Sequence, residues 1–237
     1  MLSFVVPAYN EELELPATIA EIRDAAQDRQ YEIIVVDDAS TDATSTVAQN
    51  EGAKIVSINR RQIAAARNAG ARRARGDILF FVDADTQINE KHVRGAIEAL
   101  EAGCAGGSAR VVVGGRIPLW AWILIKVFST LYFGLNLGAG AFLFTTLKDF
   151  ESIGGFDEEL FIGEEIYFSI AVRKLGRFRI LPEPVVTSGR KLRMYSALEI
   201  LGNSLSVIIR GPQAARSRDG LHIWYEGKRE QRSTSSL

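Results

Sequence analysis

The stretch Gly76-Asp-Ile-Leu-Phe-Phe-Val-Asp-Ala-Asp85 decides the fold of this chain. Its middle, residues 78–82, is an apolar and β-prone run that is typical of a strand buried on both faces. The run ends in two carboxylates, Asp83 and Asp85, at the place where α/β sheets bind ligands. Mg²⁺ is usually held by one or two carboxylates together with substrate phosphates. The stretch therefore predicts a metal-bound, phosphorylated substrate, and the alternative is an ordinary Asp-rich turn.

The segments on either side alternate between strand-like and helix-like patterns. Strands are expected at residues 2–6 (ended by Pro7), 32–36, 55–58, 78–82, 109–113, 139–144, 179–181 and 185–187, and helices at 13–26, 42–49, 63–74, 93–102, 164–175 and 195–209. Repeated β-α-β units predict an α/β fold class with a Rossmann-like, mostly parallel central sheet and helices on both faces. A turn is expected at 153–157, and a disordered tail from Gly227.

The composition is typical of a globular protein. The 237 residues are 47% hydrophobic and 24% charged, which supplies enough apolar material for a sizeable core. Cys104 is the single cysteine, so an internal disulfide is excluded, as is usual in a reducing cytosol. The first residues show no signal peptide, and a cytoplasmic location is therefore expected.

Charge is unevenly distributed along the chain. Residues 1–178 hold 18 Lys and Arg against 24 Asp and Glu, whereas residues 179–237 hold 10 against 5. The basic end is expected to face anionic lipid or a phosphate group. Nucleic acid is not an expected partner, because neither a nucleic-acid-binding motif nor an aromatic-interleaved basic stripe accompanies the charge.

Residues 117–137 form an apolar segment in which Lys126 is the single charge. The length meets that of a membrane span, but a central Lys costs roughly 2.5–3.5 kcal/mol on insertion scales. Trp120 and Trp122 near its start suit a membrane interface. A membrane-spanning helix, an interfacial helix and a helix buried in the protein are the three interpretations that the residues leave open.

Acidic and aromatic residues follow the first predicted strand. The sequence PAYNEE (7–12) lacks the glycines of a phosphate-binding turn, and its carboxylates would repel a phosphate. Tyr9 offers an aromatic face for a base, and Glu11 offers an acceptor for a ribose hydroxyl. The alternative is that these acidic residues only favour the first turn of the following helix.

Carboxylates also follow the second predicted strand and open a late helix. Asp38 can accept a hydrogen bond from a base N–H; the alternative is an Asp-rich turn, with Ser40 or Thr41 capping the next helix. Glu164 and Glu165 stand at a helix N-terminus, where the helix dipole is expected to keep the pKa of a carboxylate low. Such a carboxylate can act as a general base, and the alternative is ordinary N-terminal helix charge.

Arg67 lies on the helix that leads to the acidic strand. A cation at this position meets a diphosphate or steadies Asp83. The alternative is a solvated arginine face that Arg67 shares with Arg72, Arg73 and Arg75.

Five segments, taken in order, resemble family 2 glycosyltransferases with the GT-A fold. They are VVPAYNEE (5–12), IIVVDDASTDAT (33–44), AARNAGARRARGDILFFVDADT (65–86), IGGFDEELFIGEE (153–165) and RKLG (173–176). The resemblance covers about residues 1–190 and implies a GT-A domain there. Residues 1–105 would be its nucleotide-sugar-binding half and residues 106–190 its acceptor and catalytic half, followed by a C-terminal helix and basic tail at 191–237.

The resemblance also implies ligand-binding roles. The residues expected around the donor nucleotide are Pro7, Ala8, Tyr9, Glu11 and Asp38, the last of them at the base. Asp83 and Asp85 would form the DXD metal motif, with Asp85 as the direct ligand of Mg²⁺ or Mn²⁺. Asp83 is also expected among the substrate-binding residues, as is Arg67 from its own place on the helix before the acidic strand.

The catalytic positions depart in part from the family pattern. Glu165 stands where the family usually has its catalytic aspartate, directly after Glu164, so the carboxylate is retained with one more methylene. Asp157 is the fallback. Some members carry a histidine after the last core strand, whereas this chain reads TSGR (187–190). A histidine metal ligand is therefore not available there, and Arg190 would serve the diphosphate instead.

These expectations describe a metal-dependent inverting glycosyltransferase. Its donor would be a UDP- or GDP-type sugar, and its acceptor a saccharide or a lipid-linked sugar of a cell-envelope polysaccharide. A peripheral position on the inner face of the membrane is expected from the apolar segment and the basic end. The alternatives are a sugar nucleotidyltransferase, which would need a glycine-rich basic loop after the first strand, and a non-catalytic membrane-surface or scaffold protein.

Overall fold

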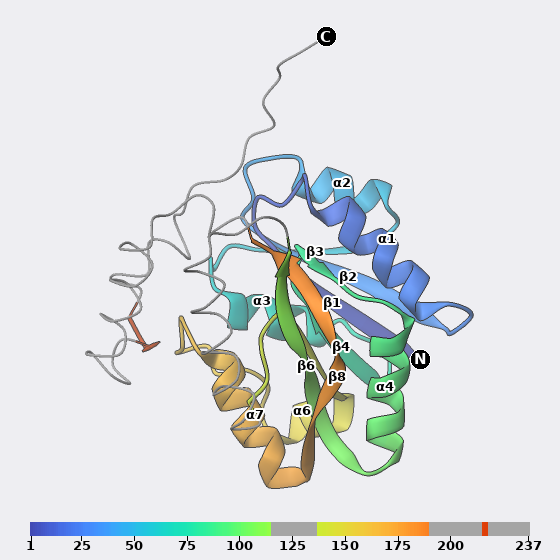
Figure 1. Ribbon diagram of the computed structural model, residues 1–237. Helices are drawn as coiled ribbons and strands as arrows, with labels where there is room; N and C mark the ends of the chain where they lie inside the picture. Colours follow the sequence, from blue (N-terminus) through green and yellow to red (C-terminus); the bar gives the residue numbers. More distant parts are fainter. Residues whose placement is uncertain (115–136, 190–214, 218–237) are drawn as a thin grey trace.

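The computed structural model describes residues 1–114, 137–189 and 215–217, which include one eight-stranded sheet with flanking helices (Figure 1). The strands follow the order β3-β2-β1-β4-β7-β6-β8-β5 across the sheet. Their bounds are β1 Leu2–Ala8, β2 Tyr31–Asp38, β3 Lys54–Ile58, β4 Ile78–Val82, β5 Thr86–Gln87, β6 Cys104–Gly114, β7 Phe142–Thr146 and β8 Arg177–Ser188. The helices of the described residues are α1 Leu15–Ala26, α2 Thr44–Asn50, α3 Ile63–Ala71, α4 Glu90–Glu101, α6 Leu147–Ser152 and α7 Glu164–Leu175.

The sheet is mixed but mostly parallel. Strands β1 to β4 run parallel to one another, β7 runs antiparallel between β4 and β6, and β6 runs parallel to β8. Strand β5 pairs antiparallel with β8. Four of the seven strand pairings are therefore parallel, and three are antiparallel. The α/β class with a mostly parallel sheet, predicted from the sequence, is confirmed.

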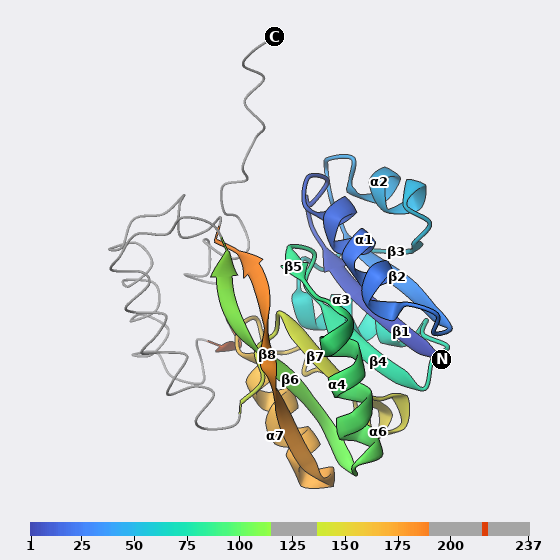
Figure 2. The ribbon, with the colours of Figure 1, turned by 45° about the vertical axis from the view of Figure 1, so that its right-hand side comes forward.

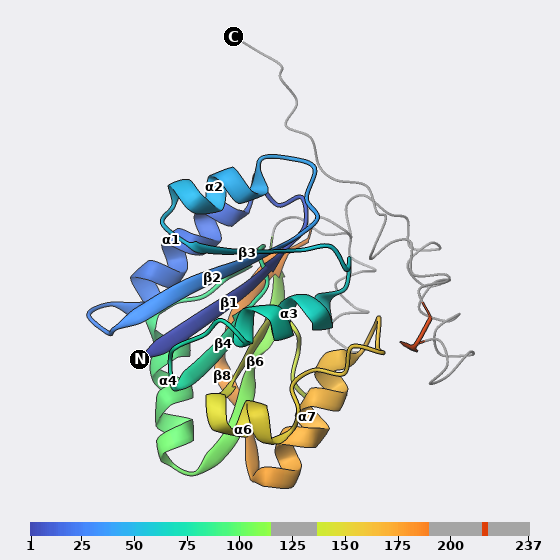
Figure 3. The same ribbon diagram turned by 180° about the vertical axis from the view of Figure 1, so that it is seen from behind.

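The apolar run of β4 is buried on both faces of the sheet, as its sequence predicts. Phe80 and Val82 belong to the cluster under α1 and α4, which cover the side turned forward in Figure 2. Leu79 and Phe81 belong to the cluster under α3, α6 and α7, which Figure 3 shows from their side. All four side chains are 0% exposed. Burying a large apolar side chain stabilises the fold by roughly 1.5–3 kcal/mol, so both helical layers contribute substantially.

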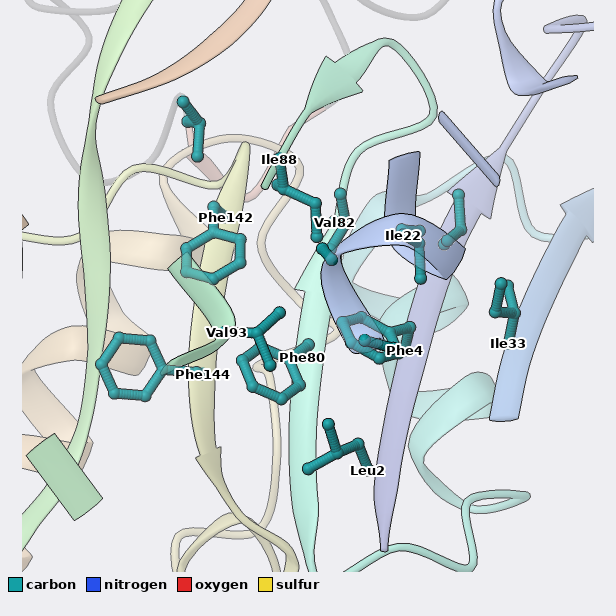
Figure 4. Packing of buried hydrophobic residues seen from close by; sticks show 14 of the residues in the cluster. Leu2, Phe4, Ile22, Ile33, Phe80, Val82, Ile88, Val93, Phe142 and Phe144 are labelled. Atoms are coloured by element: carbon teal, nitrogen blue, oxygen red, sulfur yellow. The ribbon is translucent and has the colours of Figure 1, made fainter. Parts of the chain in front are cut away.

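Aromatic rings form a row through the first of these clusters. Phe4 on β1 stacks on Phe80 with ring centroids 4.8 Å apart, and Phe142 and Phe144 continue the row on β7 (Figure 4). Offset aromatic pairs contribute roughly 0.5–1.5 kcal/mol beyond their buried area. The row fixes β7 against the strand that carries the DXD motif.

Strand β1 continues through Pro7 to Ala8, although the sequence predicts that Pro7 ends it. The pairing of β1 with β4 stops at Val5, whereas the pairing with β2 continues to Ala8. Pro7 therefore lies where β1 has an open edge toward β4, which is where a strand tolerates proline.

Strand β6 begins five residues earlier than the sequence predicts, at Cys104 instead of Ala109. Its first part contains Gly106 and Gly107, which are poor strand formers. A Cβ atom at Gly107 would lie 2.2 Å from the carbonyl oxygen of Arg179 and 2.3 Å from the ring of Phe144. The glycine is needed for this close approach, and sequence propensity misses it.

Strand β8 is one continuous strand, although Pro182 and Pro184 predict two short ones. Both prolines lie in an irregularity of the ladder, where Ala109 pairs with Leu181 but Val111 pairs with Val185. The bulge accommodates the missing N–H groups.

Two short elements were not predicted, namely β5 and α6. The predicted caps of α2 are also wrong, because α2 begins after Ala43 and neither Ser40 nor Thr41 caps it. Both hydroxyl residues instead bond to the loop that follows β1.

The predicted helix at 195–209, the tail from Gly227, Arg190 and nearly all of the segment 117–137 lie outside the described residues. Within the described part of the chain, every helix is too short or too polar to cross a membrane. The division into a nucleotide-binding half and an acceptor half stays a prediction.

Candidate active site

The acidic loops predicted from the sequence lie together at the carboxyl ends of the parallel strands. Because β1, β2 and β4 run parallel, the loops that follow them leave the sheet on the same side. The hydroxyl of Thr18 on α1 donates to the carbonyl oxygen of Ala84 at 2.8 Å, and the Ser188 N–H donates to that of Asp85 at 3.2 Å. The DXD loop is thus held between α1 and the end of β8.

The loops after β1 and β2 are hydrogen-bonded to each other. The Asn10 N–H donates to Ser40 Oγ at 3.0 Å, and the Thr41 N–H donates to Asn10 Oδ1 at 2.8 Å. The Glu11 N–H donates to Thr44 Oγ1 at 2.9 Å. These contacts hold the backbone around the predicted nucleotide-binding residues before any ligand arrives.

Pro7 and Ala8, the other predicted donor-pocket residues, lie at the end of β1 next to this loop. Ala8 is buried, whereas Pro7 is partly exposed. Whether they contact a nucleotide stays a prediction, as it does for Glu11.

The carboxylate of Asp38 is engaged by its own chain. Its Oδ1 accepts from the backbone N–H groups of Arg60 and Arg61, both at 2.7 Å, and its Oδ2 accepts from that of Gln62 at 2.7 Å. Asp38 is 4% exposed. It therefore holds the segment 60–62, which follows β3, against the end of β2. The contact of Asp38 with a nucleotide base stays a prediction.

Arg61 lies over the aromatic ring that the sequence assigns to the base. Its guanidinium carbon is 3.2 Å from the centroid of the Tyr9 ring, which is a close cation–π contact. The backbone of Arg61 has a φ of 49°, and Asn10 and Ala39 have φ values of 53° and 63°. Each of these left-handed, non-glycine residues follows one of the strands β1, β2 and β3. Such strain often clusters at ligand-binding sites.

Sequence reasoning missed Arg61. The available signal was the basic pair Arg60-Arg61 directly after a predicted strand, opposite the acidic loops.

Arg67 on α3 is the central cation of the site. It is 1% exposed, and its Nη1 donates to Glu164 Oε1 at 2.6 Å. Its Nη2 donates to Asp83 Oδ1 at 3.0 Å and to the carbonyl oxygen of Gly140 at 2.9 Å. Of the alternatives left open by the sequence, the structure shows the one in which Arg67 steadies Asp83. A solvated arginine face is wrong for this residue.

Asp83 and Asp85 present their carboxylates beside this cation. Burial raises the pKa of Asp83, Arg67 opposes the shift, and the charge of Asp85 adds to it, so that the net shift is upward. Thr187 Oγ1 on β8 donates to Asp85 Oδ1 at 3.2 Å. Two neighbouring carboxylates are a hard-oxygen donor set that fits Mg²⁺ or Mn²⁺ completed by phosphates and water. No cluster of three or more His, Cys, Asp or Glu side chains suited to a metal occurs among the described residues.

Glu164 and Glu165 open α7 after Gly163, whose φ is 76°. Glu164 is 5% exposed and takes the ion pair with Arg67. Burial, together with the charge of Glu164, raises the pKa of Glu165 to about 8. The low pKa expected from the helix dipole is therefore wrong for Glu165, because its neighbour takes the buried cation.

Asn68 anchors the turn that the sequence predicts at 153–157. Its Nδ2 donates to the carbonyl oxygen of Phe156 at 2.9 Å, and its Oδ1 accepts from the N–H of Phe156 at 2.9 Å. Asp157, the fallback base, accepts from the Glu159 N–H at 2.9 Å and thereby stabilises a local turn.

The family model described as "Glycosyl transferase family 2" matches residues 3–181. Dolichol-phosphate mannosyltransferase of Pyrococcus furiosus is 36% identical over 126 residues, which cover 50% of this chain and 36% of that protein. Undecaprenyl-phosphate 4-deoxy-4-formamido-L-arabinose transferase of Aeromonas hydrophila is 34% identical over 113 residues, which cover 44% of this chain and 34% of that protein. The chain thus spans about a third of the length of these two relatives.

Solved structures show the same fold at lower identity. Mannosyltransferase PcManGT of Pyrobaculum calidifontis, in complex with GDP-Man and Mn²⁺, matches with a TM-score of 0.62 and 19% identity, covering 91% of this chain and 66% of that one. Glucosyl-3-phosphoglycerate synthase of Mycobacterium tuberculosis, in complex with Mn²⁺, UDP and phosphoglyceric acid, matches with a TM-score of 0.64 and 21% identity, covering 88% and 76%. The GT-A fold expected from the sequence is confirmed.

Proposed function

The chain belongs to glycosyl transferase family 2, and we propose on this premise that it is a metal-dependent, inverting enzyme. It moves a sugar from a nucleoside-diphosphate sugar to an acceptor hydroxyl. The observation that carries the proposal is the Arg67 bridge, since one buried guanidinium contacts both Asp83 of the metal motif and Glu164 at the start of α7. This bridge supports the proposal that the predicted metal ligands and the predicted base, Glu165, act in one site.

Asp85 and Asp83 would hold a divalent ion, with Asp85 as the direct ligand. When bound, Mg²⁺ or Mn²⁺ acts as a Lewis acid that neutralises the departing nucleoside diphosphate. Mn²⁺ is named in the complexes of two relatives of similar fold, which supports this choice. The Thr187 hydroxyl and the Ser188 N–H orient Asp85 toward the donor.

The donor nucleotide occupies the loops after β1, β2 and β3. Tyr9 supplies an aromatic face, and Arg61, already over that ring, supplies a cation for a ligand that carries phosphates. Asp38 keeps the segment 60–62 in place, so the donor meets a preorganised pocket. Relatives of similar fold are described with UDP-GlcNAc and with GDP-Man, which supports a UDP- or GDP-type sugar as donor.

Glu165 is the general base of this proposal. It takes the proton of the acceptor hydroxyl as that oxygen attacks the anomeric carbon, while the bond from this carbon to the diphosphate oxygen breaks on the opposite side. A pKa raised to about 8 gives the carboxylate greater basicity than an ordinary Glu. Glu164 is held by Arg67 and positions its neighbour.

The acceptor is proposed to be a lipid-linked sugar, which offers the hydroxyl that Glu165 deprotonates. The support is the chemistry named for two relatives, which are transferases of dolichol phosphate and undecaprenyl phosphate. The basic end of the chain, with 10 Lys and Arg against 5 Asp and Glu over 179–237, suits an anionic membrane surface. Co-flotation with anionic liposomes tests whether the protein binds a membrane surface, and a Trp120→Ser/Trp122→Ser variant serves as comparison. A wild type that does not float with the liposomes would refute membrane binding.

The central experiment combines binding and turnover. Thermal-shift measurements with UDP and GDP in the presence of Mn²⁺ identify the nucleotide, because a ligand of the folded state raises its stability. Hydrolysis of the matching nucleotide sugar is then compared for wild type, Asp85→Asn and Glu165→Gln. Full turnover by both variants would refute the site, and pyrophosphate release from a nucleoside triphosphate and a sugar phosphate would indicate a nucleotidyltransferase instead.

A further inference from the structure

Gln62 is the residue at which the donor side and the catalytic side of the site meet. Its backbone N–H donates to Asp38 Oδ2 at 2.7 Å. Its side-chain Nε2 donates to the carbonyl oxygen of Leu160 at 3.1 Å and to that of Glu158. Gln62 is 4% exposed, so these contacts are made away from water. One buried residue thereby joins the segment after β3 to the loop 157–163 before α7.

We propose that Gln62 is a positioning residue of the transfer reaction. It holds the loop 157–163, and with it the start of α7 where Glu165 stands, against the nucleotide side of the site. This inference rests on the proposed function, because it assigns Gln62 to the placement of the proposed base. The two hydrogen bonds donated by the side-chain amide, and not the volume of the side chain, hold the loop.

The segment 60–62 is a fixed point from which an amide can position a loop. Asp38 accepts hydrogen bonds from three consecutive backbone N–H groups of this segment, each at 2.7 Å. Hydrogen bonds to a carboxylate are roughly twice as strong as those between neutral groups. They are strong enough to keep Arg61 at a φ of 49°, a conformation that costs an L-residue about 1–2 kcal/mol.

The loop at the other end is held in place by side-chain contacts. It has no helix or strand between the end of α6 and the start of α7. Asn68 holds its beginning at Phe156, and Arg67 holds its end at Glu164. Gln62 donates to two backbone carbonyl oxygens in its middle, where Asn68 Nδ2 also donates to Glu158 Oε1 at 2.9 Å and Arg216 pairs with Glu159. A buried carbonyl that loses its donor costs roughly 1–3 kcal/mol, and the loop avoids that cost by moving toward water.

Loss of the amide should affect the chemical step more than nucleotide binding. Among the described residues, the Asp38 carboxylate accepts from backbone N–H groups of the segment and not from the Gln62 side chain, so the pocket around Tyr9 and Arg61 does not need that side chain. The general base is at the end of the loop that the amide holds. A misplacement of about 1 Å costs on the order of 100-fold in rate.

The test uses Gln62→Met, which keeps the volume but removes the donor, and Gln62→Asn, which keeps the amide but shortens its reach. Gln49→Met on the exposed surface of α2 is the matched control. For each variant, affinities for UDP and GDP with Mn²⁺ are measured, then turnover of the nucleotide sugar that the wild type hydrolyses. Hydrogen exchange of residues 157–163 is followed by mass spectrometry without nucleotide.

Both Gln62 variants are expected to keep the nucleotide affinity of the wild type within about twofold. They should lose roughly 10- to 100-fold in kcat and exchange faster over 157–163. A parallel loss of affinity and kcat would show a merely structural role and overturn the inference, as would wild-type kcat or unchanged exchange. A wild type that binds neither nucleotide would refute the proposed function instead, while the exchange measurement still decides whether Gln62 holds the loop.

Discussion

Arg67 donates to Glu164 at 2.6 Å across a sequence separation of 97 residues, and both side chains are buried. This ion pair fixes the start of α7 to α3. Because the same guanidinium also donates to Asp83 at 3.0 Å, the position of the proposed metal motif is linked to that of the proposed base. The site is therefore organised around a buried cation, and not around a cluster of solvent-exposed arginines.

Removing this cation should destabilise the protein. Arg67→Met leaves Glu164 and Asp83 without their partner, and breaking a buried pair from one side costs about 3–5 kcal/mol. We expect the free energy of unfolding, measured by denaturant titration near neutral pH, to fall by about this amount. Arg72→Met, at an arginine whose side chain is 65% exposed, is the control and should lose less than about 1 kcal/mol. Equal losses would contradict a central role for Arg67.

Gly140 should tolerate no side chain, because it shares space with the same guanidinium. A Cβ atom there would lie 2.8 Å from Arg67 Nη2. We expect Gly140→Ala to displace Arg67 and to lower both the thermal midpoint and the turnover. The free energy of unfolding should fall by about 1–3 kcal/mol, as is typical of overpacked sites. Gly95→Ala on α4 is the control, since its Cβ would meet Leu181 at 3.4 Å, an ordinary contact. In a helix interior that change is neutral or stabilising.

Local patterns explain why much of this site was predictable. The run at 78–82 combines apolar residues buried on both faces with carboxylates at its end, and both properties belong to neighbouring residues in the sequence. Parallel strands then bring the loops after β1, β2 and β4 together by topology alone. The sequence thus indicates which loops meet, even without side-chain detail.

The rest depends on partners that are distant in the sequence. Nothing near Arg67 indicates that Glu164 lies beside it, so the raised pKa of Glu165 was not foreseeable from helix position. Gly106 and Gly107 are in a strand because a neighbouring strand and ring come too close for a Cβ atom. Propensity describes a residue alone, whereas these outcomes are set by what lies across the sheet.

The shifted pKa of Glu165 predicts a pH-dependent stability. Its pKa is about 8 in the fold, whereas a Glu in an unfolded chain titrates near roughly 4.3. The folded state holds the proton more tightly, so this contribution is complete below the unfolded pKa and is lost as pH rises through the folded one. Without metal, the thermal midpoint of the wild type should fall more between about pH 6 and about pH 9 than that of Glu165→Gln. Exposed Glu101→Gln should follow the wild type; a Glu165→Gln curve parallel to the wild type's would refute the raised pKa.

Arg61 should contribute more to nucleotide binding than to the fold. Arg61→Gly removes the guanidinium over Tyr9 and places glycine where the backbone has a φ of 49°. We expect the thermal midpoint of the free protein to be unchanged or higher. Affinity for the nucleoside diphosphate should fall by about 10- to 150-fold, because a hydrogen bond between charged groups contributes roughly 1.5–3 kcal/mol. A lower midpoint with unchanged affinity would show that Arg61 is structural.

Thr187 should tune the affinity of the metal site through Asp85. Its hydroxyl donates to Asp85 Oδ1 at 3.2 Å, and β5 holds Thr86 opposite Thr187 in the ladder, so the contact is set by the sheet. Loss of a hydrogen bond to a metal ligand typically costs 10–100-fold in metal affinity. Thr187→Val keeps the shape but not the donor, and we expect it to weaken Mn²⁺ binding by about tenfold when measured directly, by electron paramagnetic resonance with nucleoside diphosphate present. Thr187→Ser retains the hydroxyl and should bind Mn²⁺ as the wild type does. Equal Mn²⁺ affinities for the Val and Ser variants would show that this hydroxyl does not orient the ligand.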